Sequence, residues 1–489
     1  MRYLLLAALL LAAVPLGTGL LDTVAWPNLA LAASPVPLDT PAEELRLGHQ
    51  LPAVAVLPFA AMLAAIALFP LLAGHWWEKN RNKFFVSLAL ALPVAAYLVL
   101  GWRQAGLHEL AHTSREYLSF IILLGSLYVA SGGIHVRGSL AGTPTINTFM
   151  MACGAVLANF VGTTGASMLL VRPLLKANHS RLRQAHVLVF FIFIVSNCGG
   201  LLTPLGDPPL FLGFLNGVPF GWTLRLWPQW LLVNGLLLAI FNIWDRVALA
   251  REERQRPASH LEQAVLQHEP MRLEGLHNLL LLAGVVATIY SAGRGLGNAG
   301  RPWPYGVQEG LMLALAVASY FTTSAGIHQR NRFGFGPIVE VAVLFAGIFV
   351  TMTPALLILN VRGGELGIRE PWQYFWASGG LSSFLDNAPT YLTFAATACG
   401  IHGVPLYGRY LETLLALPAA SGAAETLAAI SCGSVMMGAN TYIGNGPNFM
   451  VKAIAEENGV RMPGFFGYML YSCGILLPVF VVVTFIFFR

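Results

Sequence analysis

The chain has 489 residues, of which 56% are hydrophobic and only 10% are charged, and its mean hydropathy is +0.65. Soluble globular domains carry about 25% charged residues. The composition therefore excludes an ordinary soluble domain and predicts an all-α polytopic membrane protein. The net charge of +5 comes largely from short loops, where it indicates orientation in the membrane and not nucleic-acid binding.

The N-terminal region has two interpretations. Residues 1–33 begin with Met1 and Arg2, continue as a leucine- and alanine-rich run and end in small residues. This pattern is typical of a signal peptide with a cleavage site, and an uncleaved first helix fits it equally well. In both cases the polar linker 34–51 lies outside the cell.

Ten apolar segments are long enough to cross a bilayer, which takes about 20 helical residues. They lie near residues 52–74, 84–101, 117–134, 186–214, 228–248, 276–293, 308–326, 336–359, 425–452 and 464–488. Two further apolar stretches, 146–175 and 372–400, are each broken near the middle by polar residues.

The chain divides into two halves. Residues 249–275 are rich in arginine and glutamate and are the one substantial soluble stretch between apolar segments. We interpret them as a cytoplasmic linker between a first transmembrane repeat, 52–248, and a second, 276–489.

The two halves resemble each other in sequence. Residues 154–163 align with 378–387 at a leucine and a phenylalanine, and residues 203–209 align with 441–447 at a threonine, a glycine and a proline. The identities are few, but they recur in the same order at nearly the same separation. This pattern predicts an internal repeat.

Clusters of basic residues indicate the topology. They lie at 79–83, 172–183 and 246–256. If stretch 146–175 crossed the membrane once, the first and last clusters would lie on opposite sides. A re-entrant hairpin places all three in the cytoplasm, as the positive-inside rule requires. The halves then become inverted repeats, each with a re-entrant helical hairpin and a broken transmembrane helix, as in many secondary transporters.

Turn-forming residues interrupt two of the apolar segments at corresponding places in the halves. The first break spans residues 197–209 and the second spans 438–448. Backbone in hydrocarbon must satisfy its own hydrogen bonds, so such breaks persist where they line a cavity or a bound solute. A matched pair of breaks predicts the binding site of a secondary transporter.

Two aspartates in these regions are candidate cation ligands. Asp207 lies in the first break, and Asp386 lies at the tip of the second hairpin beside Asn387. A charge within an apolar segment is costly and is by default a functional hypothesis. Carboxylate, amide and hydroxyl oxygens suit a small hard cation. Each aspartate could instead, or in addition, cap the helix that follows it.

Two other ionisable residues have structural interpretations. Glu340 lies near Arg330 and Arg332 in the sequence, and we expect an ion pair among them. Lys452 is expected to extend to the cytoplasmic interface.

Amides and hydroxyls complete the predicted ion- or substrate-binding site. Asparagines on apolar helices, including Asn159, need hydrogen-bond partners. The residues predicted to bind the transported solute are Asp207, Asp386, Asn387, Ser382, Asn197, Thr203, Thr163, Asn440, Thr441, Asn445 and Asn448.

The chain contains two motifs that are typical of soluble enzymes. His108, Glu109 and His112 match the zinc-protease pattern in what is expected to be a short extracytoplasmic loop, so a membrane metalloprotease is the remote alternative. The glycines of 295–300 match a dinucleotide fingerprint but follow a membrane helix and not a strand. Five scattered cysteines form no metal-ligand spacing, and no phosphate-binding loop is present. We therefore expect no enzyme activity, no cofactor and no metal beyond a transported cation, with an ion gradient driving transport.

Residues 197–209 resemble the ion transporter superfamily, which contains NhaD-type sodium/proton antiporters, arsenite pumps and citrate or dicarboxylate carriers. The elements around Asp207 and Ser382-x-x-x-Asp386-Asn387 resemble the NhaD and arsenite branches most. Residues 162–168 and 384–390 are similar to a bacterial group labelled either sodium/proton antiporter or citrate transporter. The resemblance covers roughly residues 52–488.

The resemblance implies that two hairpin tips meet two unwound helices near the midplane, inside a dimer-forming scaffold. It also implies ion ligands in the second hairpin, namely Asp386, Asn387 and Ser382, and in the first break, namely Asn197, Thr203 and Asp207. One departure matters, because NhaD-type antiporters carry the Ser-x-x-x-Asp-Asn pattern in both hairpins. Here the first hairpin has Ala158, Gly162 and Thr163 at those positions, which puts the antiporter's ion stoichiometry in doubt.

The sequence thus predicts a multi-pass transporter of the bacterial inner membrane, surrounded by lipid and assembled as a homodimer. Its predicted function is exchange of sodium (or lithium) for protons, with Asp207 and Asp386 binding either the cation or a proton. The alternative is a sodium- or proton-coupled transporter of citrate or another carboxylate. The sequence offers no midplane arginine for such an anion, which favours the cation.

Overall fold

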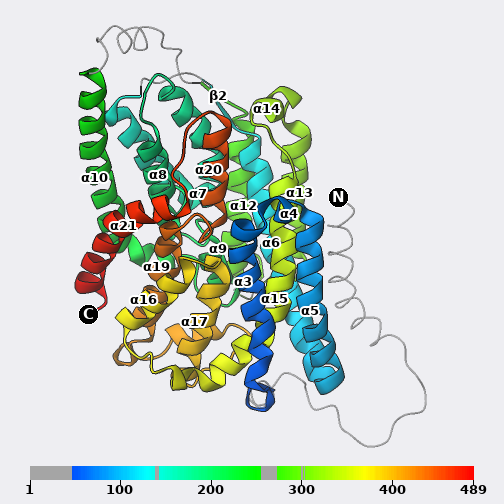
Figure 1. Ribbon diagram of the computed structural model, residues 1–489. Helices are drawn as coiled ribbons and strands as arrows, with labels where there is room; N and C mark the ends of the chain where they lie inside the picture. Colours follow the sequence, from blue (N-terminus) through cyan, green and yellow to red (C-terminus); the bar gives the residue numbers. More distant parts are fainter. Residues whose placement is uncertain (1–46, 138–141, 255–271, 299–300, 302) are drawn as a thin grey trace, which may run out of the picture.

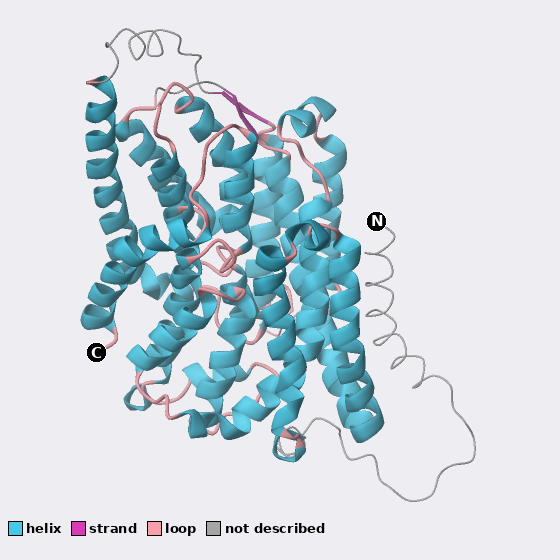
Figure 2. Ribbon diagram, in the orientation of Figure 1, coloured by secondary structure: helices cyan, strands magenta, loops and turns pink. Residues whose placement is uncertain are grey.

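The computed structural model describes residues 47–137, 142–254, 272–298, 301 and 303–489. The predicted leader, most of the first linker and most of the second linker lie outside these residues. The described part is a bundle of helices with one small pair of strands (Figures 1 and 2).

The elements before the second linker are mostly long helices. They are η1 (Ala53–Val56), α3 (Leu57–Leu72), α4 (Gly74–Trp77), α5 (Asn80–Trp102), α6 (Gln104–Gly132), β1 (His135–Arg137), α7 (Pro144–Ala177), α8 (Ala185–Ile194), η2 (Cys198–Leu201), α9 (Pro208–Leu215), η3 (Trp222–Leu226) and α10 (Trp227–Glu253).

The elements after the linker follow a similar order. They are β2 (Arg272–Glu274), α12 (His277–Arg294), α13 (Val307–Thr322), α14 (Ala325–Arg330), α15 (Gly336–Arg362), η4 (Gly363–Leu366), α16 (Pro371–Ser382), α17 (Asn387–Ile401), α18 (Tyr410–Leu415), η5 (Ala419–Ser421), α19 (Ala423–Met437), η6 (Gly438–Asn440), α20 (Gly446–Glu457) and α21 (Phe465–Phe487). Strand β1 pairs antiparallel with β2, which holds the end of the linker against the first half.

The predicted apolar segments are helical. Six helical segments of the described chain are long and apolar enough to cross a membrane. They are Ala53–Pro70, Asn80–Trp102, Pro144–Ala177, Trp222–Glu253, Gly336–Leu366 and Phe465–Phe487. An all-α polytopic membrane protein accounts for this composition and architecture.

Helix α7 folds back on itself. Its direction changes at Gly162, where φ is +77° and ψ is 157°, a conformation that glycine adopts without a Cβ clash. The start of α7 then returns to its end, since the Asn147 Nδ2 donates to Asn178 Oδ1 at 2.9 Å. The polar break predicted within 146–175 is therefore a turn between two antiparallel arms.

The break predicted within 372–400 separates α16 from α17, which pack against each other. Figure 1 shows α7 and α8 in the upper half of the molecule and α16 and α17 in the lower half. The folded-back helix α7 and the α16–α17 pair therefore reach the centre of the molecule from opposite ends. Irregular segments lie between helices in the middle of the molecule (Figure 2).

A second group of helices packs beside these units. Helix α15 contacts α5, α6 and α17, and α6 contacts α13 and α7. The predicted pairing of Glu340 with Arg330 and Arg332 is wrong. Instead, the buried Lys83 of α5 contacts Glu340 of α15 at 2.6 Å. The helix that brings Lys83 alongside is distant in sequence, whereas the two arginines pair with Glu274 and Glu457.

A buried charge network ties the upper ends of α7, α8 and α10 together. The Arg181 guanidinium contacts Asp245 at 2.7 Å and Glu252 at 3.3 Å. Asp245 also contacts His186 Nε2 at 2.8 Å and accepts a hydrogen bond from Asn147 at 3.0 Å. Every member is therefore paired, which is the condition under which buried charges are tolerated.

Replacing Asp245 with alanine should destabilise the protein by about 3–5 kcal/mol, because Arg181 would lose its main buried partner. We expect a clearly lower melting temperature for D245A in detergent, measured by intrinsic fluorescence. The control is E253A, which removes an exposed carboxylate from the same helix. Equal melting temperatures for the two variants would contradict a stabilising role of this network.

Candidate functional site

The first break is an unwound segment between α8 and α9. Helix α8 ends at Ile194, η2 follows at Cys198–Leu201, and α9 begins at Pro208. Gly200 and Gly206 approach each other so closely that a Cβ on either would collide with the other's backbone. These glycines allow the segment to make a tight loop within the protein interior.

Asp207 lies at the end of this loop, at the N-cap of α9. Only 1% of its surface is exposed. Its side chain makes no capping hydrogen bond to α9, so the capping interpretation of Asp207 is wrong. The backbone takes an extended conformation there, which turns the carboxylate toward other elements.

Three side chains donate hydrogen bonds to the Asp207 carboxylate. Thr163, one residue after the turn of α7, donates from its hydroxyl to Oδ1 at 2.7 Å. Asn445 donates from Nδ2 to the same oxygen at 3.2 Å, and Asn387 donates to Oδ2. The carboxylate thus joins the first break to α7, to the second break and to the tip between α16 and α17.

The second break repeats this arrangement with different chemistry. Helix α19 ends at Met437, η6 spans Gly438–Asn440, and α20 begins at Gly446. Asn445 occupies the N-cap of α20 with φ −152° and ψ 140°, close to the φ −146° and ψ 146° of Asp207. An amide therefore stands where the first break has a carboxylate.

Corresponding threonines anchor the two breaks. The Thr203 hydroxyl donates to the Asn159 carbonyl at 2.5 Å, and the Thr441 hydroxyl donates to the Ser383 carbonyl at 2.5 Å. Positions 159 and 383 also correspond in the sequence alignment of the halves. Asn440 extends the second set by donating to the Ser383 hydroxyl at 2.9 Å.

Three asparagines bridge the breaks. Asn197 donates to Asn448 Oδ1 at 2.7 Å. Asn448 donates to the carbonyls of Gly438 and Thr441, each at 2.9 Å, and Asn445 donates to Asn197 Oδ1 at 3.2 Å. The amides predicted from sequence to need partners are thus largely partners of one another.

The remaining predicted residues lie around this network. The Asp386 carboxylate accepts from the Ala388 amide at 3.0 Å, so its predicted role as the cap of α17 is confirmed. The Ser382 hydroxyl donates to the Ser434 carbonyl at 2.6 Å. Their roles in binding a solute stay predictions.

A small cavity adjoins Asp207. Its volume is about 80 Å³, and it lies between the turn of α7, the start of α9, and side chains of α6 and α15. Asp207 is the one ionisable group in its lining apart from Tyr128, and no lysine, arginine or histidine of the described chain lines it. The charge of this cavity is therefore negative or neutral, according to the protonation of Asp207.

The placement predicted for the zinc-protease motif is wrong. His108, Glu109 and His112 lie within the continuous helix α6 and not in a loop, because α5 ends at Trp102 and α6 begins at Gln104. The reversal takes place at the single residue Arg103, where φ is +43°. Among the described residues, no group of three or more His, Cys, Asp or Glu side chains could hold a metal ion.

Two residues of the site were not among the predicted ligands. Asn159 accepts a hydrogen bond from the Leu202 amide at 2.8 Å and donates to the Gly199 carbonyl at 2.8 Å. Ser383 donates to the Met437 carbonyl at 3.1 Å. Their alignment between the halves was the signal that could have identified them.

Lys452, expected at an interface, pairs with Glu456 at 3.2 Å.

Two broken apolar helices that meet at a buried carboxylate, in a protein built of helices able to cross a membrane, are typical of a membrane transport protein. A family model described as "Putative citrate transport" matches residues 48–488. The chain therefore belongs to this family of membrane transporters. No curated protein matches the chain.

Replacing Asn448 with leucine should destabilise the centre of the protein. The variant would leave the Gly438 and Thr441 carbonyls and the Asn197 amide without this partner, at about 1–3 kcal/mol for each buried group. We expect a lower melting temperature and faster cleavage by protease. N458A, which changes an exposed asparagine just after the same helix, is the control. Unchanged stability of N448L would show that the bridge between the breaks is dispensable.

Proposed function

We propose that the protein is a cation-coupled secondary transporter in which Asp207 binds, in turn, a sodium (or lithium) ion and a proton. Its activity is then exchange of sodium for protons. Asp386 is proposed as a second cation-binding carboxylate, since it directly precedes Asn387, whose side chain donates to Asp207. Thr163, Asn387 and Asn445 position the Asp207 carboxylate.

The observation that carries this proposal is a buried carboxylate with neutral donors only. Burying a charge without a compensating charge is costly, and a bound cation or a proton removes that cost. The buried Asn387 Oδ1, beside Asp207, has no hydrogen-bond partner among the residues that the structure describes. It supplies a second hard oxygen of the kind that small cations prefer.

The size of the cavity supports a small solute in this conformation. A volume of about 80 Å³ accommodates an ion with a few waters, since one water needs roughly 10–15 Å³ of such volume. A larger solute would require the site to open.

The repeat architecture supplies a route to alternating access. We infer that 52–248 and 276–489 are inverted repeats and that α7 and the α16–α17 pair are re-entrant hairpins. The matching anchors at Thr203 and Thr441, and the approach of the two units from opposite ends of the molecule (Figure 1), support this inference. A bacterial inner-membrane location and a homodimer complete the proposal.

Sodium- or proton-coupled transport of citrate is the second candidate, and two observations favour it. The family match is described as citrate transport. In addition, α9, α17 and α20 all begin at the site, at Asp207, Asp386 and Asn445. The dipole of a helix gives its N-terminus a partial positive charge, which attracts carboxylates. In this candidate the cation at Asp207 is the coupling ion.

Replacing Asp207 with asparagine should abolish sodium-dependent proton movement in inverted vesicles, measured with a pH-sensitive dye. The nearly isosteric amide cannot bind a proton and then release it at neutral pH, nor can it neutralise a cation. The signal should fall to that of vesicles lacking the transporter. E253Q, which changes an exposed carboxylate outside the site, should retain wild-type activity. Full activity of D207N would exclude Asp207 as the coupling group.

Citrate distinguishes the two candidates in the same vesicles. For the antiporter, sodium moves protons without citrate, and radiolabelled citrate does not accumulate. For the citrate transporter, a sodium or proton gradient drives citrate accumulation, and D207N abolishes it. Sodium-dependent proton movement that requires citrate would replace the first candidate with the second.

A further inference from the structure

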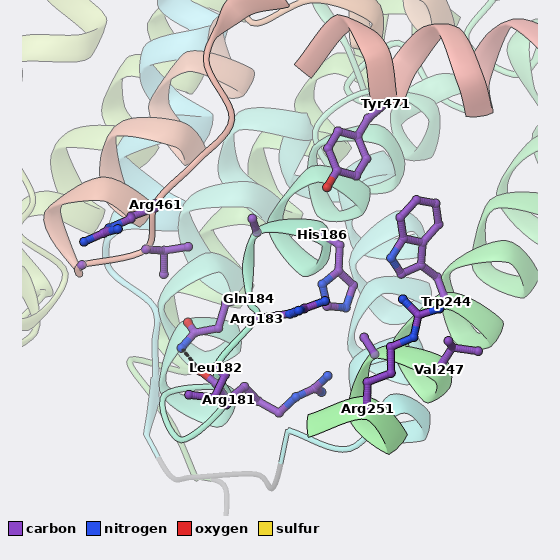
Figure 3. A pocket seen from close by; sticks show the side chains of 14 residues that line it. Arg181, Leu182, Arg183, Gln184, His186, Trp244, Val247, Arg251, Arg461 and Tyr471 are labelled. Atoms are coloured by element: carbon purple, nitrogen blue, oxygen red, sulfur yellow. Dashed lines mark hydrogen bonds between the residues drawn. The ribbon is translucent and has the colours of Figure 1, made fainter. Parts of the chain in front are cut away.

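A large basic pocket lies at the upper end of the molecule, apart from the central site. Its volume is about 920 Å³, and it is lined by the start of α8, the last turns of α10, residues 459–461 and Tyr471 of α21. None of the residues predicted to bind the transported solute lines it. We call it the arginine pocket, after Arg183, Arg251 and Arg461, which lie on different sides of it in Figure 3.

These three arginines differ from the fourth one in the wall. Arg181 is buried and is neutralised by Asp245 and Glu252. Arg183, Arg251 and Arg461 are exposed, and none forms a salt bridge with an acidic side chain in the part of the chain that the structure describes. The pocket therefore presents three positive charges that the described protein does not balance.

The wall of the pocket that α10 and α21 form also carries aromatic and apolar side chains. Trp244 of α10 and Tyr471 of α21 contact each other with ring centroids 5.8 Å apart. Val247 is 46% exposed, and the adjacent Ile243 is 65% exposed. Helices α10 and α21 lie at the edge of the bundle (Figure 1), so this wall continues into an outer apolar surface.

We propose that the arginine pocket binds the headgroup of an anionic phospholipid. The guanidinium groups match phosphate oxygens in geometry and charge. Trp244 and Tyr471 suit the boundary between headgroup and acyl chains, and the chains lie along the outer face of α10. A small soluble anion would gain nothing from contact with the apolar side chains of α10. We therefore assign a lipid and not a soluble phosphate or carboxylate. Basic pockets between membrane helices on the cytoplasmic side are suited to such headgroups.

The test is lipid binding by the full-length protein in detergent, followed by native mass spectrometry. The probes are phosphatidylglycerol and phosphatidylcholine with the same acyl chains. Removing all three charges (R183Q, R251Q and R461Q together) should weaken phosphatidylglycerol binding about a hundredfold, or about fivefold per arginine. Phosphatidylcholine binding should not change.

Two further variants keep the test decisive. R461Q alone changes only a loop residue and should lower phosphatidylglycerol affinity about fivefold even if the triple variant folds poorly. R246Q removes a charge from the exposed side of α10, where Arg246 contacts Asn242 outside the pocket, and should retain the wild-type affinity. Equal phosphatidylglycerol binding by the wild type and R461Q overturns the proposal. So does arginine-dependent binding of inorganic phosphate or citrate that phosphatidylglycerol does not displace.

Discussion

The structure depends on how two interrupted helices satisfy their backbone and side-chain polar groups away from water. A broken helix inside an apolar protein leaves N–H and C=O groups that no solvent can reach. Here the first break finds partners on α7, on α10 and at Asn445 of the other break, and the second finds them on α21 and at its own Asn448. Asn448 alone occupies two carbonyls and one amide. The candidate binding site and the folded centre of the protein consequently share the same hydrogen bonds.

This arrangement gives the two breaks unequal charge. At the two N-cap positions the first half has Asp207 and the second has Asn445, and at the two turns it has Thr163 where the second has Asn387. All of these side chains meet at the Asp207 carboxylate. The site is thus built from matching backbone geometry but unequal charge. One carboxylate with three neutral donors can change its charge by binding a single cation or proton, without disturbing a salt bridge.

The sequence predicted the helices and both breaks, because apolar length and clusters of Gly, Pro, Asn and Asp are local signals. It also predicted that the asparagines on apolar helices have hydrogen-bond partners, as they do. The sequence could not identify which side chains pair with one another.

Glu340 pairs with Lys83 across helices and not with the arginines nearest in sequence. The zinc-protease pattern was expected in a loop because it lies between the apolar segments 84–101 and 117–134, whereas one residue, Arg103, makes the reversal and the pattern lies within α6. Contacts between distant segments depend on packing, which local patterns do not encode.

The charge balance at Asp207 also constrains any anion that uses the site. Helices α9, α17 and α20 each direct an N-terminus there, equivalent to about half a positive charge apiece. Two ionised carboxylates, those of Asp207 and of Asp386 at the N-cap of α17, offset that field, and a citrate carboxylate would face them at close range. A proton or sodium ion on Asp207 reduces the repulsion and leaves the helix termini to act on the anion. If citrate is the solute, the cation must therefore bind first. If protons and sodium are the only solutes, transport consists of replacing one cation on Asp207 by the other. In either case, the charge state of Asp207 decides what the site can hold.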